Sequence, residues 1–400
     1  MTEGFALAPG FRTAATACGL KKTGALDLMM VVADAPCSAA GVFTSNRVQA
    51  APVLYDRDVL GQSAGQMRAV IANSGCANAC TGDEGKANTR QMAQLAADII
   101  GARADQVLVL STGVIGRQLD MTKVTAGVQA LARGSWSRDA IATSEAIMTT
   151  DTRPKRASVS GTIAGKTVTV AGMSKGAGMI HPGMATMLAV ITTDAAVAPD
   201  LLYRALKEVS DMSFNRISVD GDMSTNDTVL LLASGVSGAT VSVAELPAFV
   251  ELLRVVCVDL AKKIARDGEG ATKLVEIRVT GAINPTMAHR VADSIACSPL
   301  VKTAIHGNDP NWGRVVCAAG YSGAEIDPDT LTLDFGLGAE QIRLVKGGMP
   351  LVVDLDAASQ LLRRENVYIT LDLGLGTAAT TVWTCDFSKE YVEVNAHYTT

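Results

Sequence analysis

The chain has 400 residues, of which 48% are hydrophobic, 19% charged and only 4% aromatic, and it contains 37 glycines. This composition excludes a disordered chain and predicts a large aliphatic core, in one α/β body with an accessory lobe or in roughly two to three folding units. The formal net charge is −5 without any block of Lys or Arg, so we expect neither nucleic acid nor an anionic membrane as a partner.

Targeting and redox signals predict a cytoplasmic protein. The first residues lack the basic and apolar regions of a signal peptide, and no apolar run is long enough to span a membrane. Of the eight cysteines, only Cys76 and Cys80 lie close together. Their spacing is a poor zinc pattern, and the four histidines lack metal-ligand spacing. We therefore expect reduced, mostly buried thiols and no metal site.

Strand-like and helix-like segments alternate along the first part of the chain. Strands are predicted over residues 27–34, 40–45, 67–75 and 106–112. Helices are predicted over residues 85–101, 121–134 and 137–148. Gly101 is the expected C-cap of the first helix and Ser137 the expected N-cap of the last. Residues 157–173 read as a hairpin with a glycine turn.

The segment from Ser174 to Ala195, SKGAGMIHPGMATMLAVITTDA, changes at Met184 from a glycine-rich loop into an apolar, β-branched strand. Later helices are predicted near residues 199–212, 245–266 and 286–305. Later strands are predicted near residues 227–234, 274–280, 366–373 and 379–386. Because strict βαβ alternation is missing, we expect mixed or antiparallel sheets covered by helices. The segments LDFGLG (333–338) and LDLGLG (371–376) are similar, but two short matches do not establish a repeat.

Two segments nearly match nucleotide-binding loops. These are SGTIAGKT (160–167) and GLGTAA (374–379). A strand pattern follows each of them, whereas a phosphate-binding loop must open a helix. We interpret both as turns and expect no cofactor.

Six segments are dense in glycine and polar residues. They are STGVIG (111–116), TTDTRPK (149–155), SKGAGMIHPGMAT (174–186), SFNRISVDGDMSTNDT (213–228), RDGEGATK (266–273) and GNDPNWGR (307–314). Loops of this kind between core elements tend to carry function, although each one alone is equally well explained as a turn.

Thr186 lies where the glycine-rich loop meets the strand. A threonine hydroxyl is a weak nucleophile without a base, but a threonine at the start of a chain can use its own α-amine, whose pKa is about 7.7–8.0. Cutting the bond between Ala185 and Thr186 would create such a residue. The residues alone leave this open and favour a plain strand threonine.

The sequence GMIHPGMATML closely resembles the self-cleaving junction of the ornithine acetyltransferase (ArgJ) family, the bifunctional acetyltransferases of arginine biosynthesis. Family-like segments follow in family order from residue 8 to residue 400: APGFR, GVFTSNRVQAAPV, NSGCANACTG, STGVIG, MTTDTRPK, SFNRISVDGDMSTNDT, RDGEGATK, GNDPNWGR and YVEVNAHYTT. Mild departures from the family's usual residues, at Cys76, Met223 and His397, remove no catalytic group, and we expect the one at Cys76 to bear on substrate preference.

The resemblance implies an α/β fold of the self-cleaving, N-terminal-threonine type: a sandwich of β-sheets flanked by helices, with a second α/β lobe. It implies an α-chain of residues 1–185 and a β-chain of residues 186–400 that begins with the nucleophile Thr186. Thr112 and Gly113 match the family's oxyanion-hole pair. The positions matching its substrate-binding residues are Thr149, Lys175, Thr186, Glu269, Asn395 and Thr400.

The implied activity moves acetyl from N2-acetylornithine to glutamate through an acetyl ester on Thr186, without a cofactor. Acetyl-CoA is expected as a further acetyl donor, and a heterotetramer of two α- and two β-chains as the assembly. Two alternatives stay open. One is an aminopeptidase or amidase of the same fold, and the other is a non-catalytic sensor of acylated amino acids, against which the intact Thr186, Thr112 and Lys175 argue.

Overall fold

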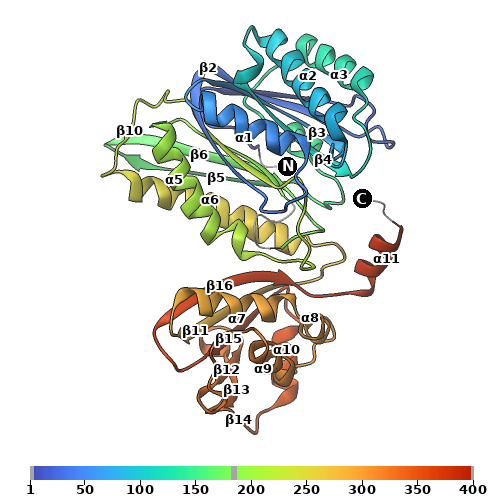
Figure 1. The fold of residues 1–400 in the computed structure, drawn as a ribbon. Helices are drawn as coiled ribbons and strands as arrows, with labels where there is room; N and C mark the ends of the chain where they lie inside the picture. Colours follow the sequence, from blue (N-terminus) through green and yellow to red (C-terminus); the bar gives the residue numbers. More distant parts are fainter. Residues whose placement is uncertain (1–3, 182–186, 398–400) are drawn as a thin grey trace.

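The computed structural model describes residues 4–181 and 187–397. The predicted cleavage bond between Ala185 and Thr186, and the C-terminal Thr400, lie outside these residues. Figure 1 shows a larger body, coloured blue to yellow, above a smaller lobe in orange and red. The chain continues beyond this lobe into the last helix, α11 (Lys389–His397), which lies beside both parts. The expected second lobe in the later half of the chain is thus confirmed.

One eight-stranded sheet runs through the larger body. Its strands are β1 (Phe11–Thr16), β2 (Leu28–Phe43), β3 (Met67–Cys76), β4 (Val107–Val114), β5 (Lys155–Ile163), β6 (Lys166–Lys175), β7 (Leu188–Thr193) and β9 (Thr228–Ala233). Their order is β4-β3-β2-β9-β7-β6-β5, with β1 beside β2. The two strands predicted over residues 27–45 are one 16-residue strand, β2, whose first half pairs with β1 and β3 and whose second half pairs with β9.

The long strand β2 divides this sheet into two halves that face each other. Met29 of β2 and Val190 of β7 belong to one buried cluster between the halves. Their sequence neighbours Met30 and Ile191 belong to two other clusters, each beneath helices. Successive side chains of a strand point to opposite faces, so each half buries one face against the other half and one against helices. The expected sandwich of mixed sheets flanked by helices is confirmed.

Helices cover both outer faces of the sandwich (Figure 1). The helices of this body are α1 (Ala51–Ser63), α2 (Gly82–Ile100), α3 (Met121–Arg133), α4 (Ile141–Ala146), α5 (Pro199–Met212) and α6 (Leu246–Arg266). Helices α2 and α3 pack on the half that contains β3 and β4, and α5 and α6 on the half that contains β5 to β7. Helix α2 ends as predicted, with Gly101 in the left-handed conformation at φ +64°.

The helix predicted over residues 137–148 is present but shorter, because α4 spans only Ile141–Ala146. Ser137 does not cap it. Its carbonyl oxygen accepts a hydrogen bond of 2.7 Å from the Thr13 N–H, and its own N–H donates to the Thr13 carbonyl. Pairing with β1 therefore satisfies the N–H and carbonyl groups of Ser137, so that they are not available for helical hydrogen bonds.

The second lobe contains a six-stranded sheet in the order β14-β13-β12-β15-β11-β16. Its strands are β11 (Leu274–Ala282), β12 (Thr332–Phe335), β13 (Ile342–Lys346), β14 (Met349–Pro350), β15 (Asn366–Asp372) and β16 (Ala378–Cys385), and its helices are α7 (Pro285–Cys297), α8 (Pro299–His306), α9 (Trp312–Gly320) and α10 (Leu355–Leu362). The two similar segments LDFGLG and LDLGLG are antiparallel neighbours, with Leu333 opposite Leu371. The helix predicted over residues 286–305 is divided into α7 and α8, because Ser298 accepts the Val301 N–H and caps the second helix.

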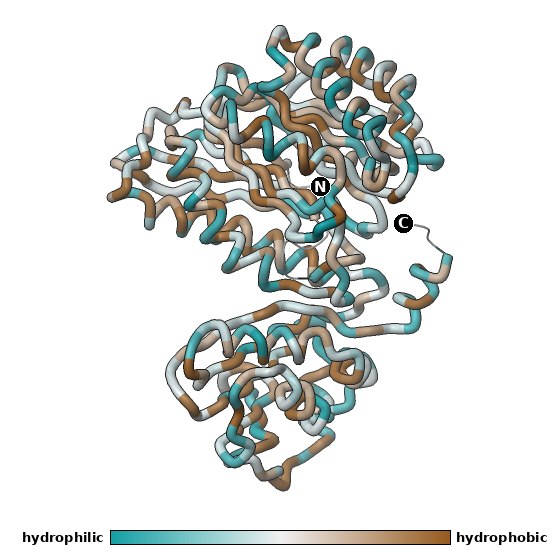
Figure 2. Tube along the Cα trace, viewed as in Figure 1, coloured by the Kyte–Doolittle hydropathy of each residue, from teal (hydrophilic) through white to brown (hydrophobic). Residues whose placement is uncertain are grey.

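Shorter elements complete the fold. They are a two-stranded sheet of β8 (Ala196–Val197) and β10 (Thr240–Val241), and the short helices η1 (Ala104–Gln106), η2 (Phe214–Arg216), η3 (Pro328–Thr330) and η4 (Gly338–Glu340). Figure 2 shows hydrophobic positions, in brown, along the strands of both parts. Among the helices of the described residues, none is long and apolar enough to cross a membrane.

Candidate active site

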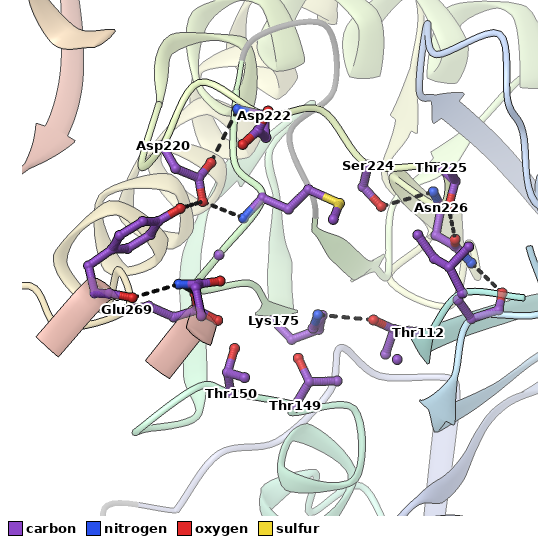
Figure 3. Close-up of a pocket in the computed structure, with 17 residues that line it drawn as sticks. Thr112, Thr149, Thr150, Lys175, Asp220, Asp222, Ser224, Thr225, Asn226 and Glu269 are labelled. Carbon is purple, nitrogen blue, oxygen red and sulfur yellow. Dashed lines mark hydrogen bonds between the residues drawn. The ribbon is translucent and has the colours of Figure 1, made fainter. Parts of the chain in front are cut away.

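A cavity of about 690 Å³, part of it open to solvent, lies where loops at the ends of β4, β6 and β9 meet α11 (Figure 3). Its lining consists of Ala77, Thr112, Gly113, Ile115, Thr149, Thr150, Lys175, Gly178, Met179, Asp220, Asp222, Ser224, Thr225, Asn226, Glu269, Tyr391 and Asn395. Five of the six polar segments noted in the sequence contribute to this lining. The sixth, residues 307–314, lies in the second lobe, where the Asn311 side chain caps α9.

The cavity brings together most of the predicted site residues. Those that line it are Thr112, Gly113, Thr149, Lys175, Glu269 and Asn395. Ala185, Thr186 and Thr400 lie outside the described residues. The six residues that line the cavity are therefore shown to lie together, while the chemical role of each of them stays a prediction.

Lys175 and Thr112 form the polar centre of the cavity. The Lys175 Nζ donates a 3.0 Å hydrogen bond to the Thr112 Oγ1, and both side chains are buried. An ammonium group only donates, so the Thr112 oxygen is the acceptor and its own proton is free to donate elsewhere. Burial lowers the pKa of Lys175, while the nearby Asp151 opposes this shift. Lys175 therefore fixes the orientation of the Thr112 hydroxyl.

Gly113 must be glycine where it lies. Its φ is +130°, and a Cβ there would lie 2.4 Å from the Gly75 carbonyl carbon. The pairing of β3 with β4 also shifts register at Gly75 and Cys76. The end of β4 therefore departs from regular strand pairing beside Thr112. A backbone N–H can bind a substrate atom only where it is not used in such pairing.

A buried ion cluster, which the largely exposed Arg153 joins at 3.7 Å from the Asp267 carboxylate, supports the cavity from behind. The Lys155 Nζ lies 2.5 Å from the Asp151 Oδ1 and 2.6 Å from the Asp267 Oδ2. The Asp151 carboxylate also accepts the N–H groups of Thr149 at 2.9 Å and Gly176 at 2.7 Å. Burial would raise the pKa of Asp151, but the charges of Lys155 and Lys175 and the hydrogen bonds from Gly176 and Lys155 together outweigh it and hold this pKa at about 2. Asp151 thus fixes the backbone beside two predicted substrate-binding residues.

Glu269 forms the opposite wall of the cavity with α11. The Asn395 Nδ2 donates a 2.8 Å hydrogen bond to the Glu269 Oε2 (Figure 3). A Cβ at Gly178 would lie 2.3 Å from the same oxygen, so a larger residue there would displace the carboxylate. The buried Glu269 is thereby held at the cavity by a residue 126 positions later in the chain.

Asp220 holds the chain that leads to the predicted junction. Its carboxylate accepts the N–H groups of Met179 at 2.6 Å and Ile180 at 2.9 Å, and the Tyr391 hydroxyl lies 3.3 Å away. Burial raises the pKa of Asp220, and these two backbone donors oppose the shift. The segment that enters the junction is therefore anchored up to Ile180.

Asp227 holds the chain on the other side of the junction. Its Oδ1 accepts the Met187 N–H at 3.0 Å, and the Thr228 N–H donates to the Met187 carbonyl at 3.1 Å. Burial raises the pKa of Asp227 well above its usual value. Within the described residues, its Oδ2 has no hydrogen-bond partner. A buried carboxylate thus lies directly beside the residue that follows Thr186.

Several of these residues were not predicted individually. Asp151, Lys155, Asp220 and Asp227 all belong to the polar segments 149–155 and 213–228, so the clustering of polar residues was their signal. Tyr391 gave no signal beyond its place in the family-like C-terminal segment. The departure at Cys76 does not reach the cavity lining, because its buried Sγ donates to the Arg117 carbonyl at 3.3 Å.

Comparison with known proteins points to one family. The family described as "ArgJ family" matches residues 12–400. Arginine biosynthesis bifunctional protein ArgJ from Thermotoga neapolitana is 47% identical over 98% of this chain and 99% of its own length. The protein of that name from Symbiobacterium thermophilum is 46% identical over 98% and 97%. The crystal structure of arginine biosynthesis bifunctional protein argJ from Bacillus halodurans is 43% identical, with a TM-score of 0.50, and covers 52% of this chain and 97% of the solved chain.

Proposed function

This chain belongs to the ArgJ family, and from that premise we propose that it is a glutamate N-acetyltransferase of arginine biosynthesis. It removes acetyl from N2-acetylornithine, holds it as an ester on Thr186, and passes it to glutamate. The observation that carries the proposal is the single cavity in which Thr112, Gly113, Lys175 and Glu269 meet. The names of the relatives argue against a non-catalytic sensor and against a plain aminopeptidase.

The nucleophile is the Thr186 hydroxyl, and its own α-amine serves as the base. The hydroxyl oxygen attacks the acetyl carbonyl carbon while the amine accepts the hydroxyl proton. When the tetrahedral intermediate collapses, the C–N bond breaks and the ornithine nitrogen takes that proton. Glutamate then attacks the ester carbon with its amine, and the Thr186 oxygen leaves with a proton. Bonds and protons balance without a cofactor.

The negative charge of the tetrahedral intermediate lies on the former carbonyl oxygen. The Thr112 hydroxyl, oriented by Lys175, and the Gly113 N–H are the donors proposed for it. Both belong to the end of β4, an edge strand of the sheet whose residues are mostly buried, so they need little rearrangement. Such fixed donors stabilise the intermediate more than mobile water does.

Charged side chains at the cavity match an amino-acid substrate. The Lys175 ammonium can bind the α-carboxylate that acetylornithine and glutamate share. The Glu269 carboxylate suits the cationic side-chain amine of ornithine. Because α11 contributes Tyr391 and Asn395 to the lining, this helix screens one side of the cavity from water. That screening lets the acetyl ester wait for glutamate.

Self-cleavage between Ala185 and Thr186 is part of the proposal. Strands β6 and β7 flank the junction and pair with each other, with Lys175 opposite Leu188, and β7 also pairs with β9. The two products would therefore remain one folded body. The solved Bacillus halodurans chain supports this organisation, since it covers 52% of this chain and 97% of itself. A heterotetramer of two α- and two β-chains, and a cytoplasmic location, stay predictions.

Two measurements test this function. Mass spectrometry of the denatured protein should show two fragments, the second beginning with Thr186, whereas Thr186→Ala should remain one inactive chain. Steady-state rates at several glutamate concentrations should give parallel double-reciprocal lines, because one hydroxyl holds the acetyl group between substrates. Intersecting lines would exclude the acetyl ester, and acetate release that ignores glutamate would indicate a hydrolase.

Acetyl-CoA is proposed as a second acetyl donor, because the relatives are named bifunctional proteins. A thioester is a better acyl donor than an amide, so Thr186 could accept its acetyl group. Mixing enzyme, glutamate and acetyl-CoA without acetylornithine should release one thiol for each acetylglutamate formed. Transfer from acetylornithine without any thiol release would make the enzyme monofunctional.

A further inference from the structure

A cluster of three metal-ligand side chains lies outside the catalytic cavity, where the larger body meets the second lobe. His181 follows the anchored Ile180, and Asp293 and Cys297 lie on α7 of the second lobe. His181 and Cys297 are 116 positions apart. This separation explains why spacing along the chain predicted no metal site.

The three donor atoms lie nearly as close together as those around a tetrahedral ion. The His181 Nδ1 lies 3.5 Å from the Cys297 Sγ and 4.0 Å from the Asp293 Oδ1, and the last two atoms are 3.8 Å apart. Zinc bonds of about 2.0–2.3 Å place neighbouring tetrahedral donors roughly 3.3–3.6 Å apart. The two distances to the Cys297 Sγ lie within a few tenths of an ångström of this range, whereas the Nδ1–Oδ1 distance must shorten by about 0.5–0.7 Å for one ion to bind all three atoms.

A helix and an anchored loop position these groups. Asp293 and Cys297 are one turn apart on α7, so their side chains share a face of that helix. The Ile180 N–H donates to Asp220, and the Ile180 carbonyl accepts the Val219 N–H at 2.8 Å, which fixes the chain immediately before His181. The donors thus come from two anchored segments.

The cluster is partly open to solvent, and further polar groups lie near it. The side chains of His181 and Asp293 are 26% and 28% exposed, so an ion can enter and a water can complete its coordination. The Ser218 Oγ lies 3.3 Å from the Cys297 Sγ. One turn earlier on α7, the buried Nδ1 of His289 has no hydrogen-bond partner among the described residues.

We propose that His181, Asp293 and Cys297 bind one divalent transition metal ion of borderline softness, Zn²⁺ in the first place, and that the ion links the larger body to the second lobe. The imidazole, carboxylate and thiolate set is one that Zn²⁺ prefers. On binding, the Sγ–metal bond forms and the thiol proton leaves to solvent. A ligand that binds only the folded chain stabilises it, so Zn²⁺ should raise Tm.

The test uses Co²⁺ as a spectroscopic substitute for Zn²⁺ on the reduced, metal-free protein. We expect one Co²⁺ per chain, with visible bands of a tetrahedral site and a near-ultraviolet sulfur-to-cobalt charge-transfer band. Adding Zn²⁺ should abolish both. A wild-type protein without the sulfur band would overturn the proposal.

Matched variants assign the site. Cys297→Ser should lose the sulfur band and bind roughly tenfold or more weakly, whereas Cys317→Ser, which removes an exposed thiol on α9, should behave like the wild type. Asp293→Asn should keep the band with weaker binding, and circular dichroism checks that each variant folds. The proposal fails if the band survives in Cys297→Ser, or if Zn²⁺ raises the Tm of this variant as much as that of the wild type.

Discussion

The ion cluster behind the cavity of the larger body and the Arg364–Glu340 pair of the second lobe differ in their exposure to water. At the cavity, Lys155 and its partners Asp151 and Asp267 expose 2% of their side chains or less. In the second lobe, Arg364 and Glu340 pair at the surface with 52% and 60% of their side chains exposed. An enclosed pair is costly to break because one charge is left without a partner, while water screens a surface pair. We therefore expect the cavity to depend on its buried charges, whereas the second lobe should tolerate the loss of the Arg364–Glu340 pair.

Breaking the enclosed cluster should have the largest effect. Lys155→Met keeps most of the side-chain volume but removes the ammonium between Asp151 and Asp267, which leaves them only the charges of Lys175 and Arg153. We expect the free energy of unfolding to fall by roughly 3–5 kcal/mol, as for other buried ion pairs that lose one partner. Urea unfolding followed by circular dichroism measures it. A loss no larger than that of a surface variant would show that the cluster is not enclosed in solution.

The next effect separates catalysis from stability within the same cavity. Thr112→Val keeps the shape of the side chain but removes the proposed donor to the intermediate. We expect kcat to fall by about 10²–10³-fold, the typical effect of losing one such donor, with a smaller loss of stability than in Lys155→Met. Thr112→Ser retains the hydroxyl and should restore most of kcat. A Thr112→Val enzyme with unchanged kcat would remove Thr112 from the oxyanion hole.

Acid should weaken the cavity through Asp151. Its pKa is about 2 in the folded chain and about 3.9 in an unfolded one, so the unfolded chain binds the proton first as pH falls. The contribution of Asp151 is therefore complete above about pH 4 and is lost towards pH 2, to the extent of roughly 2–3 kcal/mol. Asp151→Asn should be less stable near neutrality but should lose stability less steeply below pH 4. Parallel curves of unfolding free energy against pH would contradict this assignment.

The smallest effect is expected in the second lobe. Arg364→Ala removes a surface ion pair whose two side chains are mostly in water, so Tm and the transfer rate should not change measurably. Differential scanning calorimetry beside Lys155→Met provides the comparison. A similar loss of Tm in both variants would mean that the buried cluster and the surface pair contribute equally to stability despite their different exposure.

Helices and strands with a strong hydrophobic pattern were predicted well from the sequence. Helix α2 ends at Gly101, and β3, β4, β15 and β16 lie within a few residues of their predicted positions. The short strands β13 and β14 were missed because so few residues carry too little pattern. The predicted start of α4 at Ser137 was wrong, because Ser137 pairs with the backbone of Thr13, more than a hundred residues earlier, and the helix begins only at Ile141.

The sequence by itself determined the chemistry that is available: the hydroxyl, ammonium and carboxylate groups in the polar segments, and the likeness to one family. Only the tertiary structure decided which groups meet. It placed Lys155 between carboxylates 4 and 112 positions away, left residues 307–314 outside the cavity, and brought His181 beside Asp293 and Cys297. Local patterns report neighbours within a few residues, whereas these contacts depend on how distant strands and helices pack.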